Sequence, residues 1–303
     1  MKNQEPSTRR LDKELGGVPI AAWGILLILA ITWGSSYILI KKGLVSFTPQ
    51  QVACVRMSVT FLCFLPFFAV QARNVDWSKW KPLAIVGFVG SFFPALLFAT
   101  AQTKISSSLS GVLSSFTPLA TLVLGIMFFK VKSTWTKITG VFMGLAGTLW
   151  LLFIDHAEGD WKGFRFGLLV VVACLCYGVS SNVIKNHLSD TRSLIISAVS
   201  YTMVGVPAIL YLSGSGFFQV FAEDEKAWVS FGYLCLLALF GTVLGSLFYF
   251  KLIKKTSALF ASTVSYLTPM VAMLLGAFDG EIITLLHVAG MGIILWGVYV
   301  ARR

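Results

Sequence analysis

The stretch SSSLSGVLSSFTPLATLVLG (residues 106–125) returns as SALFASTVSYLTPMVAMLLG (residues 257–276), and this pair decides the fold. At an offset of 151 residues the two stretches align without a gap, which places Ser114 on Ser265 and Pro118 on Pro269. At an offset of 144, WGSSYILIKKGL (33–44) aligns with YGVSSNVIKNHL (177–188). An internal repeat of this kind predicts two structurally equivalent halves.

The composition indicates a membrane protein. Hydrophobic residues make up 56% of the chain, charged residues only 12%, and the mean hydropathy is +0.82. A helical membrane span needs about 20 predominantly apolar residues. The sequence therefore predicts an all-α, polytopic protein with ten transmembrane helices, at about 19–40, 48–70, 82–101, 108–129, 134–154, 163–184, 193–213, 228–250, 257–277 and 281–301.

These spans predict two repeats of five helices each. We expect a cytoplasmic N-terminal tail (1–18), a first repeat (19–154), a connecting loop (155–162) and a second repeat (163–303). Because five is odd, equivalent helices of the two repeats cross the membrane in opposite directions. Inverted repeats are a hallmark of secondary transporters.

The net charge of +11 is explained by the way in which the chain is oriented in the membrane. With the N-terminus in the cytoplasm, seventeen basic residues fall on the inner side and six on the outer side, and Arg56 alone lies within a span. This bias follows the positive-inside rule and predicts that both termini are cytoplasmic. The expected surroundings are a lipid bilayer, the inner membrane of a bacterium, and no nucleic-acid partner is expected.

Several motifs together resemble a known family. The runs KISSSLSGVLSSFTPLATLVLGIMFF and KKTSALFASTVSYLTPMVAMLLGAFDGE, the WGSSY of the first helix and the Pro49-to-Arg56 start of the second resemble the EamA-type module of the drug/metabolite transporter superfamily. The resemblance implies a ten-helix bundle around a central cavity, lined by helices one, three, four, six, eight and nine, with helices five and ten outside. The sequence departs from the family pattern at one position. Such modules usually carry a glutamate just after the fourth helix of each half, and the second copy has Glu281 there, but the first has Lys130.

Helical spacing nominates the residues of a substrate site. Trp33, Ser36 and Tyr37 share one face of the first helix, and Tyr177 and Ser181 share the matching face of the sixth, with Asn182 one residue round. Tyr249 is added from the eighth helix. Aromatic rings over hydroxyls suit a small substrate with an apolar body. The alternative is that these side chains pack helices together and anchor them at the membrane interface.

The fourth and ninth helices carry stripes of small residues, which include Ser114 and Ser265. Such stripes mainly let membrane helices approach one another closely. Pro118 and Pro269 each leave the carbonyl four residues earlier without a helical donor, at those two serines. A kink is expected there, and it could serve as a gate.

Arg56 is the one charged residue expected deep within a span. An intramembrane charge suggests function, so Arg56 could bind a substrate carboxylate or phosphate. It could equally donate to carbonyls at helix ends.

The sequence thus predicts a secondary or facilitative transporter of small metabolites that works by alternating access, most simply an exporter of amino acids or related compounds. The alternative is import or exchange of another metabolite, such as a drug, a choline-like cation, a nucleoside or a sugar phosphate. An integral-membrane enzyme is a remote alternative, for which His187 and Asp190 are the best acid–base pair. No cofactor, metal site or catalytic group is expected, and the expected assembly is a monomer or weak homodimer.

Overall fold

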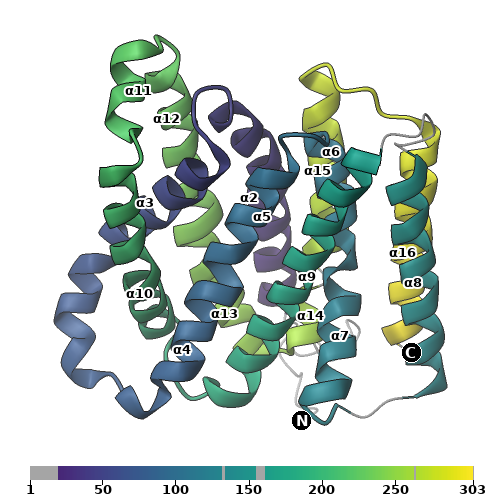
Figure 1. Cartoon of the computed structure of the whole chain (residues 1–303). Coiled ribbons are helices and arrows are strands. Elements are labelled where there is room, and N and C mark those ends of the chain that lie inside the picture. Colours follow the sequence, from purple (N-terminus) through teal and green to yellow (C-terminus); the bar gives the residue numbers. More distant parts are fainter. Residues whose placement is uncertain (1–19, 132–133, 155–160, 263, 303) are drawn as a thin grey trace, which may run out of the picture.

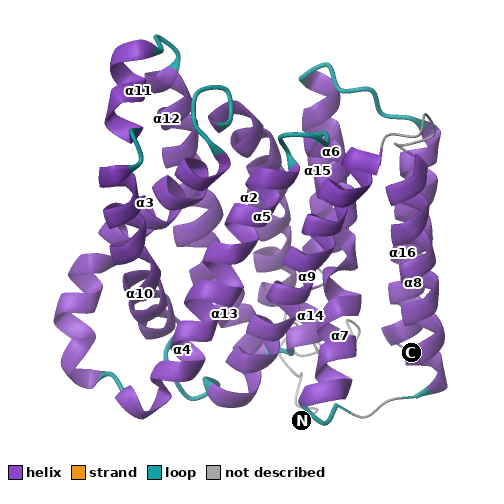
Figure 2. Cartoon of the chain, viewed as in Figure 1, coloured by secondary structure: helices purple, strands orange, loops and turns teal. Residues whose placement is uncertain are grey.

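A computed structural model describes residues 20–131, 134–154, 161–262 and 264–302, and these residues form helices and loops without a strand (Figures 1 and 2). The prediction of an all-α protein is confirmed. The expected tail at 1–18 and most of the expected loop at 155–162 lie outside the described residues.

The first half consists of α2 (Ile20–Gly43), α3 (Pro49–Gln71), η1 (Ala72–Asn74), η2 (Trp77–Lys79), α4 (Trp80–Gly87), η3 (Phe88–Phe92), α5 (Phe93–Ala101), α6 (Ser107–Leu113), η4 (Ser114–Phe116), α7 (Thr117–Phe128) and α8 (Trp135–Ile154). The second half consists of α9 (Trp161–His187), α10 (Ser193–Gly214), α11 (Phe217–Glu223), α12 (Ala227–Leu236), η5 (Leu237–Leu244), α13 (Gly245–Lys255), α14 (Ala258–Ser262), α15 (Val264–Phe278) and α16 (Leu285–Arg302).

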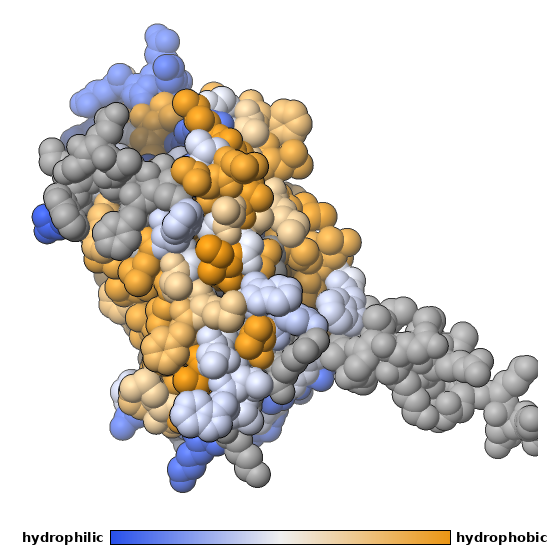
Figure 3. All heavy atoms as spheres, turned by 90° about the vertical axis from the view of Figure 1, so that its right-hand side faces the viewer, coloured by the Kyte–Doolittle hydropathy of each residue, from blue (hydrophilic) through white to orange (hydrophobic). Residues whose placement is uncertain are grey.

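The surface of this bundle fits a bilayer. Among the described residues, seven helical stretches are long and apolar enough to cross a membrane, and three shorter apolar helices accompany them. Large apolar side chains such as Phe128, Leu210 and Trp296 are exposed. Figure 3 shows one face of the molecule, on which apolar residues form a band between two hydrophilic ends. A monomeric soluble protein rarely exposes apolar surface on this scale, so the chain is a polytopic membrane protein.

The helices pack as a central group with one peripheral pair. Close partners are α3 with α10, α2 with α15, and α9 with both α5 and α7. The helices α8 and α16 pack mainly on each other, at the right of Figure 1. Glycine permits their close approach, since a Cβ on Gly297 would lie only 2.6 Å from the backbone nitrogen of Gly144.

Three spans depart from the simple helices expected from the sequence. The fourth is interrupted by the 3-10 turn η4, after which α7 begins with Pro118 in its first turn. The carbonyl of Ser114 accepts the hydroxyl of Thr117 at 2.7 Å, so the break leaves it satisfied. The third and eighth spans each contain a π-helical segment, η3 and η5. In the second copy, Pro269 lies within α15.

The segment 214–227, which lies between the spans expected at 193–213 and 228–250, contains the short helix α11. Its apolar side chains hold it in place, because Phe217 and Phe221 each pack against Phe47 and Phe231, with ring centroids 5.3 to 6.2 Å apart. The helix α11 lies at the upper end of the bundle in Figure 1, where residues 44–48, 102–106 and 279–284 also lie. Residues 188–192 and 256–257 lie at the opposite, lower end.

Candidate functional site

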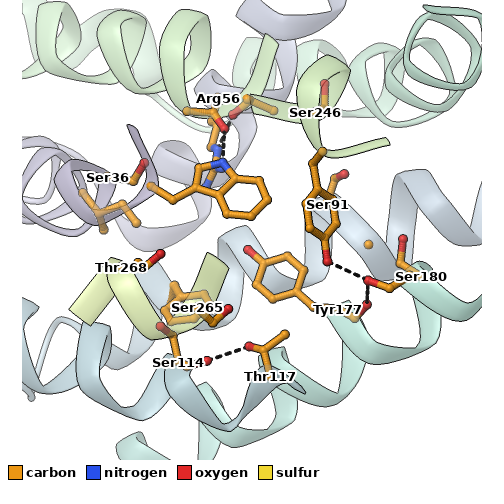
Figure 4. Close-up of a pocket in the computed structure, with 18 of the residues that line it drawn as sticks. Ser36, Arg56, Ser91, Ser114, Thr117, Tyr177, Ser180, Ser246, Ser265 and Thr268 are labelled. Carbon is orange, nitrogen blue, oxygen red and sulfur yellow. Dashed lines mark hydrogen bonds between the residues drawn. The ribbon is translucent and has the colours of Figure 1, made fainter. Parts of the chain in front are cut away.

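A cavity of about 100 Å³ lies between the two halves of the chain. It has room for several water molecules or a small organic molecule. Its lining comes from nearly every central helix, and Figure 4 shows the labelled side chains converging from both halves. The lining residues are Trp33, Ser36, Tyr37, Ile40, Arg56, Met57, Gly90, Ser91, Phe98, Ser114, Thr117, Tyr177, Ser180, Ser181, Tyr201, Gly241, Thr242, Ser246, Tyr249, Phe250, Ser265 and Thr268.

Aromatic rings form much of the cavity wall. The indole of Trp33 donates from Nε1 to the carbonyl of Gly241 at 2.8 Å, and its ring meets that of Tyr249 at a centroid distance of 4.9 Å. Phe98 lies between Tyr37, at 5.5 Å, and Tyr177, at 6.1 Å. These contacts hold the rings in place, which reduces the entropy lost when a ligand packs against them.

Hydroxyl groups supply most of the polar lining. Ser181 shares a hydrogen bond of 2.9 Å with the phenol of Tyr249, and Ser91 donates to Tyr201 at 3.2 Å. Ser114 donates to the carbonyl of Gly111 at 2.6 Å. A hydroxyl can both donate and accept, so each of these groups retains capacity for a ligand or water.

Arg56 supplies the only charged side chain of the lining. It enters from α3, its side chain is partly exposed to the cavity, and its Nε donates to the hydroxyl of Thr242 at 2.6 Å (Figure 4). Neither helix-end carbonyls nor a carboxylate accepts a hydrogen bond from it among the described residues. The lining contains no carboxylate and no histidine.

Nine of the ten residues nominated from the sequence as substrate contacts line this cavity: Trp33, Ser36, Tyr37, Arg56, Ser114, Tyr177, Ser181, Tyr249 and Ser265. Asn182 does not line it. Its buried amide donates at 2.9 Å to the carbonyls of Thr121 on α7 and Gly178 on its own helix. Because both amide protons are used to join α9 to α7, we leave Asn182 out of the candidate site.

The helical spacing missed several lining residues, chiefly Ser91, Tyr201, Thr242 and Ser246. The second and seventh spans, which the family resemblance places away from the cavity, contribute Arg56, Met57 and Tyr201. The internal repeat could have predicted two of these residues. At an offset of 151, Ser91 aligns with Thr242, directly after the aligned pair Gly90 and Gly241. Both pairs lie in the lining.

At the upper end of the bundle, the carboxylate of Glu281, in the loop between α15 and α16, joins this loop to α2 and α6. It accepts five hydrogen bonds: from the backbone amides of Ser107 and Ser108 at 3.1 and 2.9 Å, from their hydroxyls at 2.7 and 2.5 Å, and from Lys41 at 2.8 Å. We call this set the Glu281 clamp. Asp279 extends it by pairing with Lys41 at 2.7 Å and Lys42 at 2.5 Å.

The surroundings of Glu281 favour its ionised form. Burial alone would raise the pKa of the carboxyl, but the hydrogen bonds from Lys41, Ser108 and Ser107 outweigh it and hold the pKa at about 2. Glu281 is therefore ionised at the first turn of α6, where backbone amides without a helical acceptor favour an anion.

Among the described residues, the lower end has no equivalent clamp. At the positions that the repeat aligns with Glu281, Ser107 and Ser108 stand Lys130, Ala258 and Leu259. Lys130 is exposed and makes no hydrogen bond or ion pair with any described residue. Instead, Lys185, the counterpart of Lys41, donates to the carbonyl of Thr256 at 2.8 Å. The two ends of the bundle are thus held by different interactions.

A helical bundle with an apolar surface around a cavity lined by aromatic rings and hydroxyls is the architecture expected of a membrane transporter. The chain belongs to the EamA-like transporter family, whose sequence pattern matches it twice, over residues 22–153 and 165–303.

Curated relatives agree with this class. The chain is 24% identical over 282 residues to YedA, an uncharacterized inner membrane transporter of Escherichia coli strain K12, with 91% of this chain and 89% of that protein covered. It is 27% identical to YdfC, an uncharacterized transporter of Bacillus subtilis, over 88% and 86% of the two chains. It is 23% identical to an S-adenosylmethionine/S-adenosylhomocysteine transporter of Chlamydia muridarum, over 83% and 82%.

The fold is also found among solved structures. One crystal structure matches with a TM-score of 0.62 at 14% identity, covering 93% of this chain and 96% of the other. This likeness concerns the fold alone.

Proposed function

We propose that this protein is a secondary carrier of a bacterial inner membrane that exports amino acids or related small metabolites by alternating access. The two halves would act as inverted five-helix repeats, with boundaries near 19–154 and 163–303. The family and the named relatives support transport, and the inner-membrane assignment of YedA supports the location.

One observation carries this proposal. Residues that the repeat aligns at an offset of 151 line one cavity from opposite halves: Ser114 with Ser265, Thr117 with Thr268, and Gly90 with Gly241. In a carrier built of repeats, the substrate site lies at their interface, so that rocking one half against the other exposes it to alternate sides. Thr117 and Thr268 lie directly before Pro118 and Pro269, where helix geometry can change at low cost.

The same lining favours facilitated transport. Proton-coupled carriers use ionisable groups within the membrane to relay protons, and no lining residue is a carboxylate or histidine. We therefore infer that the substrate gradient drives flux and that no proton is transferred with the substrate.

The positive-inside count supports cytoplasmic termini. The upper end, with the Glu281 clamp, then faces outward. The lower end, which includes Lys185, Arg192 and Lys255, faces the cytoplasm.

The test is flux through the purified chain in proteoliposomes. Vesicles are loaded with radiolabelled amino acids, and with S-adenosylmethionine and S-adenosylhomocysteine because of the Chlamydia relative. We expect saturable efflux that follows the substrate gradient and is unchanged by an imposed pH gradient. Accumulation against the substrate gradient, driven by a pH gradient, would disprove the uncoupled mechanism. Absence of flux for every compound would count against the carrier.

A further inference from the structure

The cavity holds a positive charge without a counter-ion. Arg56 lies on α3 at membrane depth, and only its Nε has a partner, the hydroxyl of Thr242 at 2.6 Å. The ion pairs of the described residues involve Lys41, Lys42 and Lys79, and all of them lie at the two ends of the bundle. The two terminal nitrogens of the guanidinium therefore donate to no described residue.

An unpaired cation at this depth is unfavourable, because low-dielectric surroundings stabilise a charge poorly. Proteins offset such a cost by pairing the charge. The bond to Thr242 fixes the plane of the guanidinium and leaves its end, with two parallel N–H groups, free. That end matches the two oxygens of a carboxylate, which an arginine can bind with two hydrogen bonds at once.

The remaining lining discriminates between charged ligands. It consists of aromatic rings and of hydroxyls such as Ser246 and Thr268, without an acidic side chain. A permanent cation would meet Arg56 and no negative partner, and juxtaposed like charges are strongly unfavourable. An amino acid can satisfy both of its charges, with its carboxylate on Arg56 and its ammonium among hydroxyl oxygens and the face of an aromatic ring.

Charge balance also separates carboxylates from phosphate esters. One guanidinium neutralises one carboxylate. A phosphate monoester carries a charge of about −1.5 to −2 at pH 7, and the lining offers no second cation. The arrangement therefore favours monoanionic groups.

We propose that Arg56 is the anion-recognition residue of the cavity, and that the transported compound carries a single carboxylate, as amino acids and simple organic acids do. Choline-like cations and phosphate esters are excluded as cargo. This inference rests on the proposed carrier function for its biological meaning, but the binding preference can be measured without transport.

The binding test uses four probes in which a three-carbon chain joins a phenyl ring to the charged group or includes it: 3-phenylpropionate, L-phenylalanine, 3-phenylpropylamine and 3-phenylpropyl phosphate. Their affinities for the full-length detergent-solubilised chain are measured by calorimetry. We expect both carboxylates to bind at least tenfold more tightly than the amine and the phosphate. Equal or tighter binding of the amine or the phosphate, or no binding of either carboxylate, would overturn the proposal.

The matched variants are Arg56→Gln, Arg56→Lys and Arg73→Gln. Loss of one partner of a buried charge pair costs about 2 kcal/mol or more, so Arg56→Gln should weaken carboxylate binding roughly 30-fold and abolish the preference over the amine. Arg56→Lys retains the charge without the two-pronged geometry and should keep that preference with weaker binding. Arg73 is exposed, outside the cavity, so Arg73→Gln should bind as the wild type does.

If Arg56→Gln does not fold, Arg56→Lys and the probe series still decide the matter, since unchanged carboxylate affinity in Arg56→Lys would contradict two-pronged recognition. Flux separates this inference from the carrier. Transport of the amine by the wild type would refute carboxylate selection and leave the carrier function standing. Tight, Arg56-dependent binding of carboxylates without flux would support the site and refute the carrier.

Discussion

Neutralising Glu281 should loosen the upper end of the bundle. The variant Glu281→Gln keeps the shape of the side chain but removes its charge and replaces one acceptor oxygen by an NH2 group. That group cannot accept the hydrogen bonds that now reach this oxygen, either those of Ser107 and Lys41 or those of Ser108. The ordinary pKa of 4.5 falls to about 2 in the clamp. At 1.36 kcal/mol per pKa unit, the interactions of ionised Glu281 contribute about 3 kcal/mol to the free energy of unfolding.

This estimate applies to a side chain that is only 7% exposed, so solvent screening reduces it little. Loss of 3 kcal/mol should lower the midpoint of thermal unfolding by roughly 5 °C for a chain of 303 residues. The assay is thermal unfolding of the detergent-solubilised protein at pH 7, with Glu225→Gln as control. Glu225 is exposed, and its loss should shift the midpoint by no more than about 1 °C. Equal midpoints for the two variants would refute the role of the clamp.

The pH dependence gives an independent check. Since the pKa is lower in the folded protein, the contribution is complete well above pH 4.5 and disappears as the pH falls towards 2. About a quarter of it should be lost at pH 4. The difference between wild type and Glu281→Gln should shrink accordingly on acidification, and a difference that grew at low pH would contradict the assigned pKa.

Three further outcomes follow from the contacts described. Trp33→Ala and Tyr177→Ala should each weaken binding of the transported compound by about 2 kcal/mol or more while leaving the protein folded, and normal calorimetric affinity in both would remove them from the site. Gly297→Ala should destabilise the protein by roughly 1–3 kcal/mol, because its Cβ would meet the backbone of α8. A Cβ on Gly292 would have no neighbour within 4 Å, so Gly292→Ala should leave stability unchanged or raise it. A lower unfolding midpoint for Gly292→Ala than for Gly297→Ala would contradict this account of the helix packing. A cysteine at Asp224 should react with an impermeant reagent in intact cells, whereas reaction only after permeabilisation would reverse the proposed topology.

The sequence predicted the helical class and much of the cavity wall, because both depend on patterns that can be read from the sequence alone, namely helical spacing and the internal repeat. Trp33 and Tyr37 are four residues apart on one face of a regular helix, and the repeat marks Tyr177 and Ser181 as their counterparts. A period of 3.6 residues is enough to bring such residues to one side.

Helical spacing failed to predict the cavity lining where a helix is irregular, or where a contact with a neighbouring helix determines the direction of a side chain. A π-helical turn contains an extra residue, so the faces before and after η3 and η5 are rotated relative to a regular helix. Spacing alone therefore did not place Ser91 or Thr242 in the wall. Asn182 follows Ser181 by one residue, and that rotation of about 100° directs its amide to α7 instead of the cavity.

The unlike ends of the bundle have a kinetic consequence for a carrier. The free-energy difference between its two closed ends sets how often the empty protein opens to each side, and each 1.4 kcal/mol changes that ratio tenfold. A clamp built by Glu281 at one end, without a counterpart at Lys130, biases this resting distribution towards opening at the lower end. Detailed balance forbids such a bias from changing the final concentrations across the membrane. It acts on the half-saturation concentrations instead, so that entry from one face saturates at lower solute levels than entry from the other.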